Sequence, residues 1–477
     1  MSRVVIIGGG IAGLAAAYRL SYHSSEITLI ESDLRLGGKI VTERVDGFVI
    51  EGGPDAFLSL KPRGLGLCRE LGLENRLHGT NEKIRRTYVM RDGKLHELPE
   101  GLTGLIPTRF GPMIKTGLIS PLGKLRMGLD YLIPPQSPNG DESLAAFVER
   151  RLGRELYDRL IEPLMGGIYA GDGARLSLAA TFPQLRQAEL EHGGLIRGML
   201  ATKKKAPAPK PGAKQWAAFL TPTTGLAEIV EALEARLNGA NAEIRRGTRV
   251  VDVEAASPGY HVRLESEESL QADAIILATP AFITADLISN LDSPLSSVLR
   301  AIPYVSTATI SVAYRLSDTR GACPLDGYGY IIPRADNRPI LACTWTSTKF
   351  PHRAREGFGL IRAFIGRAGQ ESALDGTDDD LLKRVRDELR RTLGLTAPPI
   401  LHRIFRWPKA MPQYTLGHLE RLAVIEERLA AHPGLFVAGN AYRGIGIPDC
   451  IASGERAAEA VLKFLKSRSS ERTPVTI

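Results

Sequence analysis

Apolar residues at the beginning of the chain are arranged as strand, helix and strand. A β-branched run covers residues 3–7, helix-forming residues cover 13–21, and a second apolar run covers 26–31. Short β-branched runs are typical of buried strands, whereas leucine and alanine spaced three and four residues apart are typical of a helix. The pattern therefore predicts a βαβ unit, from which parallel sheets are built.

The middle of the chain, from about residue 96 to 215, has the spacing of several short helices separated by proline and glycine. Asp141 is expected to cap one of them. The apolar face of that helix consists of Leu144, Phe147, Val148 and Leu152. The next helical pattern runs through Leu156, Leu160 and Leu164 and is expected to stop near Pro163 and Gly166-Gly167. These patterns predict a helical insertion.

Beyond this region the pattern changes mainly to strands. A helix is expected from Thr224, followed by strands at residues 248–253, 260–264 and 274–277. An antiparallel group is expected at 306–314, 328–332, 340–346 and 360–365. A helix from Thr377, a strand at 434–439 and a helix at 451–465 complete the pattern. The predicted fold class is α/β, with a Rossmann-like domain, an antiparallel-sheet domain and an inserted helical domain.

The composition excludes several classes of protein. The 477 residues are 43% hydrophobic and 24% charged, which is enough for several domains and too apolar for a disordered chain. The four cysteines form no CxxC pair, which argues against a disulfide scaffold and a zinc ribbon. The nine histidines show no H-E-x-x-H spacing, so we expect no metal site.

The apolar runs also bear on location. None reaches the roughly 18 residues of a spanning helix, and the chain enters a strand pattern without a signal peptide. We therefore expect a cytoplasmic protein with at most peripheral membrane contact. In the helical insertion, the candidates for such contact are Leu102, Leu105, Ile106 and Phe110, near Arg109 and Lys115. The alternative interpretation is that these apolar residues pack into the core.

The net charge of +8 allows anionic partners. The most concentrated basic stretch, residues 202–211, is rich in lysine, alanine and proline and is predicted to be a solvated loop. It contains no aromatic residue, and the chain carries no nucleic-acid motif, so no nucleic-acid partner is expected. An anionic substrate and a weak attraction to a membrane surface remain open.

A glycine-rich motif follows the first predicted strand. It consists of Gly8, Gly9, Gly10, Ile11, Ala12 and Gly13, and Glu31 ends the next strand 18 residues later. Such glycines allow a tight turn, close approach of a pyrophosphate and close packing of helix on strand. The helix N-terminus attracts the phosphates, and the acid accepts hydrogen bonds from a ribose. This context predicts a dinucleotide site.

Further glycine turns indicate which dinucleotide binds. They lie at residues 36–39, 51–54 and 439–446, and another strand ends in small residues at 272–280. A plain NAD domain does not need these turns, whereas an extended FAD passes over several loops. The predicted helix after Gly446 would direct its positive end at the flavin. No second G-x-G-x-x-G is present, so we expect a non-nicotinamide electron acceptor.

Several segments resemble those of the FAD-dependent porphyrinogen oxidases, within the wider amine-oxidase-like flavoprotein superfamily. They are GGGIAG at residue 8, LGGK at 36, EGGPDAF at 51, EPLMGGIYAGD at 162, ACTWT at 342, MPQY at 411 and GIGIPDCI at 444. The resemblance spans nearly the whole chain. The glycine motif alone is typical of the superfamily, and the internal segments point to the porphyrinogen oxidases.

The resemblance implies which residues contact FAD. They are Gly8 to Gly13, Glu31, Ser32, Lys39, Gly53, Pro54, Asp55, Ala56, Val250, Trp407, Ile445, Gly446 and Ile447. One departure is Asn440 after Gly439, where many members of the superfamily have Asp. The candidate catalytic residues are Lys61 and Tyr169. The alternatives are that Lys61 is a solvated cation at a helix start and that Tyr169 is a packed turn aromatic.

The resemblance also implies an activity in heme biosynthesis. A porphyrinogen would lose six electrons in three steps, each removing a hydride from a meso carbon and a proton from a pyrrole nitrogen. Oxygen is the expected acceptor, with hydrogen peroxide released, and a ferrochelatase of the same pathway is an expected partner. The segments around Trp345, Gln413 and Asp449 are similar to Gram-positive enzymes that oxidise coproporphyrinogen III to coproporphyrin III.

Three alternatives stay open at this stage: oxidation of protoporphyrinogen IX, another amine-oxidase-like flavin oxidase, and a binding protein without flavin chemistry. The domain boundaries follow from the motifs. We expect a two-layer FAD-binding domain at residues 1–80, 222–295 and 400–477, a substrate-binding domain at 81–95 and 296–399, and a helical insertion at 96–221.

Overall fold

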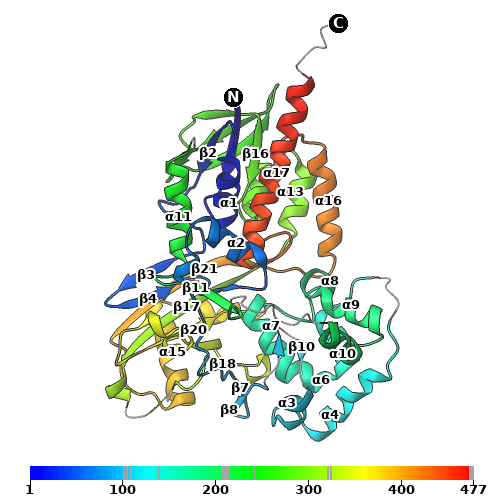
Figure 1. The fold of residues 1–477 in the computed structure, drawn as a ribbon, viewed down its shortest axis with the longest axis vertical. Coiled ribbons are helices and arrows are strands. Elements are labelled where there is room, and N and C mark those ends of the chain that lie inside the picture. Colours follow the sequence, from blue (N-terminus) through cyan, green and yellow to red (C-terminus); the bar gives the residue numbers. More distant parts are fainter. Residues whose placement is uncertain are drawn as a thin grey trace.

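The computed structural model describes residues 1–99, 102–103, 106–107, 110–136, 140–205, 215–240, 242–319, 322 and 325–471. A five-stranded parallel sheet forms the upper part of the molecule (Figure 1). Its strands, in spatial order, are β12 (Ala242–Arg245), β2 (Ser25–Ile30), β1 (Ser2–Ile7), β16 (Ala274–Leu277) and β22 (Leu435–Val437). Segments far apart in the sequence thus meet in one sheet, which confirms the predicted Rossmann-like fold.

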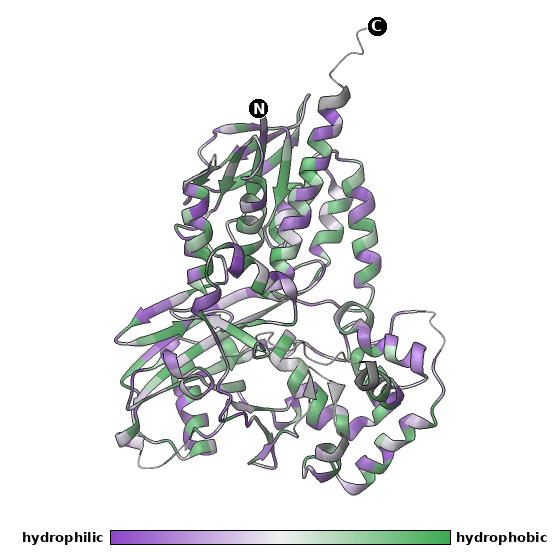
Figure 2. Cartoon of the chain, in the orientation of Figure 1, coloured by the Kyte–Doolittle hydropathy of each residue, from purple (hydrophilic) through white to green (hydrophobic). Residues whose placement is uncertain are grey.

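Both faces of this sheet are covered. Val4 and Ile6 pack with helices α1 (Ile11–Leu20), α11 (Ala227–Asn238) and α17 (Ile447–Glu471). On the other face, Val5 and Ile7 pack with the strands β13 (Val250–Ala255), β14 (Tyr260–Leu264) and β15 (Ser269–Ala272), and with the helices α12 (Ala281–Leu287), α13 (Ser293–Arg300) and α16 (His418–Ala430). Figure 2 shows hydrophobic residues along these strands. The expectation of two layers was wrong, because a continuous apolar run belongs to a strand buried on both faces.

A seven-stranded sheet lies below the parallel sheet (Figure 1). Its strands, in spatial order, are β21 (Leu401–Pro412), β17 (Tyr304–Arg315), β20 (Phe358–Ile365), β19 (Ile340–Trp345), β18 (Gly329–Ile331), β7 (Tyr88–Arg91) and β8 (Lys94–Glu97). Neighbouring strands are antiparallel except β18 and β7, which are parallel. Helix α15 (Asp378–Leu393) covers this sheet, and Thr377 caps it together with Asp380.

The seven-stranded sheet extends past the boundary expected at residue 400. Strand β21 pairs with β17 along nearly its whole length, so this sheet continues to Pro412. The assignment of segments to a FAD-binding and a substrate-binding domain stays a prediction. Further short elements lie outside these two sheets: β3 (Thr42–Val45), β4 (Phe48–Glu51), β5 (Phe57–Leu58), α2 (Pro62–Glu70), β6 (Leu77–Gly79), β11 (Phe219–Pro222) and α14 (Thr346–Lys349).

The helical insertion forms the remaining part of the molecule (Figure 1). Its elements are β9 (Leu102–Thr103), β10 (Ile106–Pro107), α3 (Phe110–Lys115), α4 (Pro121–Gly128), α5 (Leu144–Leu152), α6 (Arg154–Leu156), α7 (Glu162–Tyr169), α8 (Leu178–Thr181), α9 (Pro183–His192) and α10 (Leu195–Lys205). A 3-10 turn, Leu129–Tyr131, follows α4, and a π turn, Tyr157–Ile161, precedes α7. The side chains of Leu102, Leu105, Ile106, Arg109 and Phe110, and most of the lysine-rich loop, lie outside the described part of the chain.

The cap of α5 differs from the prediction. Ser143, not Asp141, accepts the hydrogen bond from the N–H of Ala146 at the start of this helix. Asp141 instead accepts from the hydroxyl of Ser177 at 2.8 Å and from the N–H of Gly417 at 3.0 Å. The physical reason is that Ser143 lies two residues closer to the helix, so its hydroxyl is the oxygen within reach of the free N–H groups. The carboxylate of Asp141 is therefore available to bond neighbouring segments.

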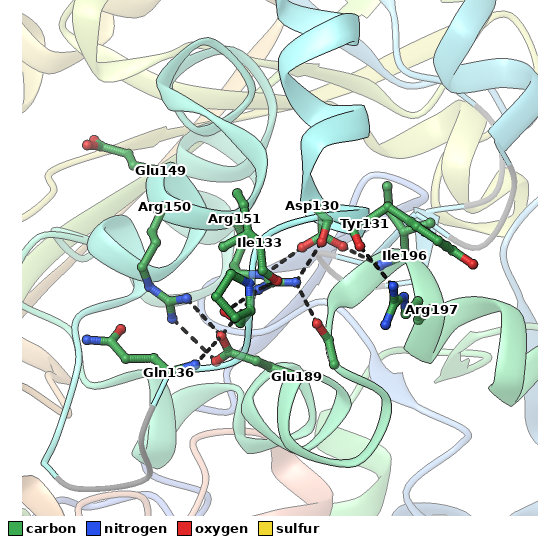
Figure 3. A network of polar contacts seen from close by, with 12 residues as sticks. Asp130, Tyr131, Ile133, Gln136, Glu149, Arg150, Arg151, Glu189, Ile196 and Arg197 are labelled. Atoms are coloured by element: carbon green, nitrogen blue, oxygen red, sulfur yellow. Dashed lines mark hydrogen bonds and ion pairs between the residues drawn. The ribbon is translucent and has the colours of Figure 1, made fainter.

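A buried polar network holds the insertion together (Figure 3). The guanidinium of Arg151 on α5 lies 2.6 Å from the carboxylate of Asp130 and donates to the carbonyls of Ile133 and Gly193. Glu189 on α9 accepts from Arg150 at 2.7 Å. Asp130, Arg151 and Glu189 have no exposed side-chain surface. In the part of the chain that the structure describes, no helix is both long and apolar enough to cross a membrane.

Candidate functional site

The turn between β1 and α1 requires glycine for different reasons at different positions. A Cβ atom on Gly13 would lie 1.9 Å from the carbonyl oxygen of Gly8, so only glycine lets the helix pack on the turn. Gly8 has a φ of +108°, and its own Cβ would lie 2.8 Å from the carbonyl oxygen of Ala278 at the end of β16. A Cβ on Gly10 would meet no protein atom within 4 Å. The position of Gly10 therefore leaves open space where a ligand can approach.

The first turn of α1 presents free N–H groups to that space. Its N-cap, Gly10, makes no side-chain cap, and the turn contains no acidic residue. Such a helix end favours a pyrophosphate. Ile11 and Ala12, both buried, form the beginning of the helix. The predicted residues Gly8 to Gly13 thus lie together around one helix N-terminus.

Glu31 lies directly beside this turn. One carboxylate oxygen accepts from the N–H of Gly9 at 2.7 Å, and the other accepts from the N–H of Asp33 at 2.9 Å and the hydroxyl of Ser32 at 3.2 Å. These bonds fix the carboxylate and leave it further lone pairs for ribose hydroxyls. Val250, at the start of β13, lies two residues after Thr248, whose N–H donates to the Glu31 carbonyl.

Lys39 lies in the second glycine loop, which contacts the first. Gly37 donates its N–H to the carbonyl of Gly9 at 2.8 Å. Burial lowers the pKa of Lys39, and the nearby Cys450 opposes this effect. No described carboxylate forms an ion pair with Lys39. Lys39 is partly buried, and an ammonium without an anionic partner is costly in such a place, so this site fits an anionic cofactor such as FAD.

The EGGPDA loop passes between this lysine and the seven-stranded sheet. A Cβ on Gly53 would lie 1.8 Å from the carbonyl oxygen of Lys39, so the loop can run this close only with glycine. The carbonyl of Gly52 accepts from the indole of Trp407 at 2.8 Å and from the hydroxyl of Thr309 at 2.7 Å. The structure thereby places Trp407 against the loop that carries Gly53, Pro54, Asp55 and Ala56.

Asp55 is ionised in this loop. Burial alone would raise its pKa, but the cations of Lys349, Arg362 and Arg353 outweigh burial and lower the pKa to about 2. The ammonium of Lys349 lies 2.9 Å from the carboxylate.

A third loop brings Ile445, Gly446 and Ile447 to the beginning of α17. The hydroxyl of Tyr414 donates to the carbonyl of Asn440 at 2.7 Å and accepts from the N–H of Gly444 at 2.8 Å, which closes the loop. The ring of His418 stacks on Tyr414 with ring centres 4.2 Å apart. Burial lowers the pKa of His418 to about 4, so the ring is neutral at pH 7.

Lys61 lies at the same helix end. Its ammonium is 2.5 Å from the carboxylate of Asp449, which also accepts from the N–H of Gly446 at 3.2 Å. The Lys61 side chain is 46% exposed, so it is available to a molecule arriving from solvent. Lys61 is therefore neither isolated nor fully solvated.

Tyr169, the other candidate catalytic residue, is buried at the end of α7. Its ring packs against Phe182 and Tyr414, with ring centres 5.8 and 6.1 Å away. Burial and the negative charge of Asp449 raise the pKa of its hydroxyl well above the usual range. Tyr169 is therefore protonated at neutral pH and cannot act as a base. A catalytic role for Tyr169 stays a prediction.

Sequence reasoning did not assign roles to several residues around these loops. Tyr414 and Asp449 lie inside segments that carry the resemblance. Their position in those segments is the only sequence feature that could have indicated a role at the site. No role was predicted for Lys349, Arg353 and Arg362, because arginine and lysine are mostly exposed in proteins.

Comparison with known proteins places this site in a family. The model of the flavin containing amine oxidoreductases matches residues 11–462. A coproporphyrinogen III oxidase from Bacillus subtilis is 38% identical over 473 residues, covering 97% of this chain and 98% of the relative. The corresponding enzyme from Staphylococcus aureus is 36% identical, covering 97% and 99%. Human protoporphyrinogen oxidase is 31% identical, covering 96% and 98%.

A solved structure from Exiguobacterium sp. 255-15, assigned as a protoporphyrinogen oxidase, superposes with a TM-score of 0.85 at 33% identity. The alignment covers 98% of this chain and 99% of that chain. A UDP-galactopyranose mutase has a TM-score of 0.70 at 15% identity, covering 100% and 97%, which shows the shared fold alone. The predicted FAD cofactor and the oxidoreductase class are confirmed, and the chain belongs to the flavin containing amine oxidoreductase family.

Proposed function

We propose that this protein oxidises coproporphyrinogen III to coproporphyrin III, using FAD and releasing hydrogen peroxide from oxygen. The observation that carries the proposal is that relatives named coproporphyrinogen III oxidase match over nearly their full length at higher identity than relatives named protoporphyrinogen oxidase. The geometry supports it, because two glycine loops meet at the beginning of α1 and a third lies at the beginning of α17, where the exposed cation of Lys61 is available. Protoporphyrinogen IX is the alternative substrate.

The proposed reaction balances over three two-electron steps. Three hydrides leave meso carbons and three protons leave pyrrole nitrogens, and one hydrogen of the fourth meso carbon moves to a nitrogen by tautomerisation, which leaves the porphyrin with two N–H groups. The three hydrides and three protons reduce three oxygen molecules to three of hydrogen peroxide. FAD, when bound, supplies the two-electron acceptor for each step. Aromatisation of the macrocycle supplies much of the driving force, so the reaction does not need a strong protein base. This agrees with the protonated Tyr169 hydroxyl.

The residues of the chain then orient the substrate and exclude water. Lys61 is placed to attract a substrate carboxylate, and its ion pair with Asp449 keeps the ammonium at the beginning of α17. Four carboxylates on coproporphyrinogen III require more cationic or N–H partners than the two on protoporphyrinogen IX. We propose that Lys61 contributes one of those partners.

Turnover of the two porphyrinogens under identical conditions tests the substrate. We expect a higher kcat/KM for coproporphyrinogen III. The variant Lys61→Ala should lower that kcat/KM by about tenfold, mainly through KM, because a charged hydrogen bond is lost. Lys463→Ala, an exposed lysine at the far end of α17, is the matched control and should leave it unchanged. A higher kcat/KM for protoporphyrinogen IX would contradict the proposed substrate. An unchanged kcat/KM in Lys61→Ala would contradict the proposed role of Lys61.

Oxygen as acceptor and a ferrochelatase as partner stay predictions. Release of three hydrogen peroxide molecules for each porphyrin, measured in air, checks the acceptor. The product keeps its carboxylates and presents four pyrrole nitrogens, so the next reaction of the pathway is metal insertion. This chemistry supports a ferrochelatase as the consumer.

We also propose peripheral contact with a membrane through the insertion. Apolar side chains are exposed on α3, on α4 and on the turn that follows α4: Ile114, Leu122, Leu125, Leu129, Tyr131 and Leu132. Leu122 is 78% and Leu132 is 76% exposed. The cation of Arg197 lies over the Tyr131 ring at 4.3 Å, so positive charge borders this apolar surface.

Sedimentation with vesicles containing anionic lipid checks this contact. We expect the protein to sediment with the vesicles and to be released by high salt or alkali. The double variant Leu122→Ser and Leu125→Ser should lower the bound fraction severalfold. Leu34→Ser, equally exposed but beside the parallel sheet, is the control. Resistance to salt and alkali, or unchanged binding of the double variant, would contradict a peripheral contact at this surface.

A further inference from the structure

Two buried arginines and a partly buried lysine lie beneath the Gly52–Asp55 loop. Lys349 ends α14, Arg353 ends the following 3-10 turn, and Arg362 lies in β20. The Arg353 side chain has no exposed surface, and Arg362 is 2% exposed. Their described anionic partners are Glu51, which is buried, and Asp55, whose side chain is 19% exposed. A protein interior seldom holds more positive than negative charge, so this excess calls for a physical explanation.

The two arginines hold backbone atoms of the loop. The guanidinium of Arg362 donates to the carbonyls of Gly52 and Gly53. The guanidinium of Arg353 donates to the carbonyl of Asp55 at 2.9 Å and to the carboxylate of Glu51 at 3.0 Å. Both contacts reach residues about 300 positions away in the sequence. The loop conformation thus depends on the seven-stranded sheet.

The charges in this cluster do not cancel. Burial lowers the pKa of Arg362 to about 10, with Asp55 and Glu51 opposing, so this guanidinium stays charged at pH 7. Burial raises the pKa of Glu51, although Arg353 opposes the effect. With both acids ionised the three cations leave a net charge of +1, and a protonated Glu51 would leave +2.

Some donors of the cluster also lack partners. Nε and Nη1 of Arg353 and Nε of Arg362 are buried without a hydrogen-bond partner among the described atoms. Unpaired buried donors keep the full cost of their desolvation. The site therefore retains positive charge at a cost in stability, which is typical of a functional site rather than of a structural clamp.

We propose that Arg362 is a positioning residue that fixes the flavin-binding loop and, with Arg353 and Lys349, raises the reduction potential of the bound flavin. A reduced flavin carries more negative charge than an oxidised one, so an uncancelled positive charge beneath the loop favours the reduced form. The proposal rests on the FAD contacts proposed for Gly53 to Ala56. It does not depend on which porphyrinogen is the substrate.

Anaerobic reductive titration of the full FAD-loaded protein tests this, without porphyrinogen. In Arg362→Met we expect the ratio of reduced to oxidised flavin at a fixed potential to fall at least tenfold, a shift of about 30 mV for a two-electron couple. Arg362→Lys keeps the positive charge but lacks the guanidinium that donates to both loop carbonyls. The reduction potential should therefore return toward the wild-type value, while FAD binding stays weaker than in the wild type. An unchanged potential in Arg362→Met, or equal shifts in both variants, would overturn the proposal.

A matched control and a second variant keep the test decisive. Arg367→Met removes another buried arginine of similar charge, which contacts Glu162 and the carbonyl of Ile332, and should leave the potential unchanged. If Arg362→Met does not retain FAD, Lys349→Met removes a cation without touching the loop carbonyls and should lower the potential in the same direction. The proposal would also be overturned if Arg367→Met shifted the reduction potential as much as Arg362→Met does, or if Lys349→Met left the potential unchanged.

Discussion

Gly10→Val protein is expected to fold and to lack flavin, whereas Gly13→Val protein is expected to fold poorly. The difference follows from the surroundings of the two glycines. A side chain on Gly10 would enter open space beside the free N–H groups at the helix end, where the cofactor pyrophosphate is expected. A side chain on Gly13 would lie less than 2 Å from the Gly8 carbonyl oxygen and force α1 away from β1.

We expect the bound FAD of Gly10→Val to fall below a tenth of the wild-type content, since the lost contacts exceed about 1.4 kcal/mol. Gly13→Val should lose more than about 3 kcal/mol of stability through overpacking. Absorbance of purified protein measures the flavin content, and thermal unfolding of protein stripped of FAD measures the fold separately. Gly128→Val, at the end of α4 and also facing open space, is the control. Full flavin content in Gly10→Val would contradict the role of this turn.

The second large effect is expected in the insertion. Arg151→Met should lower the free energy of unfolding of this region by about 3–5 kcal/mol, because it leaves the Asp130 carboxylate buried without its cation. The loss includes the hydrogen bonds to the carbonyls of Ile133 and Gly193, which fix two connections around α5 (Figure 3). Urea unfolding followed by circular dichroism measures the change.

Two further variants separate charge from packing at this position. Arg154→Met removes an arginine three residues away whose pair with Asp158 is exposed, and should cost less than about 1 kcal/mol. The double variant Arg151→Met and Asp130→Leu removes both charges and should recover part of the loss. If Arg151→Met unfolds at the same urea concentration as the wild type, the network does not stabilise the insertion.

Strands and helix starts were predicted correctly where the local sequence contains one clear pattern. The strands β14 and β16 have the predicted bounds, since β14 alternates apolar and polar residues and β16 is a short apolar run, each between turn residues. The cap of α15 at Thr377 was also confirmed, because three aspartates follow it in the first turn. Pro163 was expected to end a helix but lies in the first turn of α7, where a missing N–H costs nothing.

Contacts between residues far apart in the chain could not be predicted from the sequence. Nothing local marks β21 as the edge partner of β17, because its twelve residues mix charged and apolar side chains and contain two prolines. The glycine loops could be predicted one by one, since each is a short glycine-rich motif that is visible in the local sequence. The side chains that hold these loops, such as Tyr414 and Arg353, act across distances that a linear pattern does not encode.

The contact between α1 and α17 has a consequence for biosynthesis. A Cβ on Gly454 of α17 would lie 2.0 Å from the carbonyl oxygen of Ala12, so these two helices touch backbone to backbone. The ribosome makes β22 and α17 long after α1. The alanine face of α1 therefore stays uncovered until α17 has been made. We expect loading of the cofactor to follow the synthesis of α17.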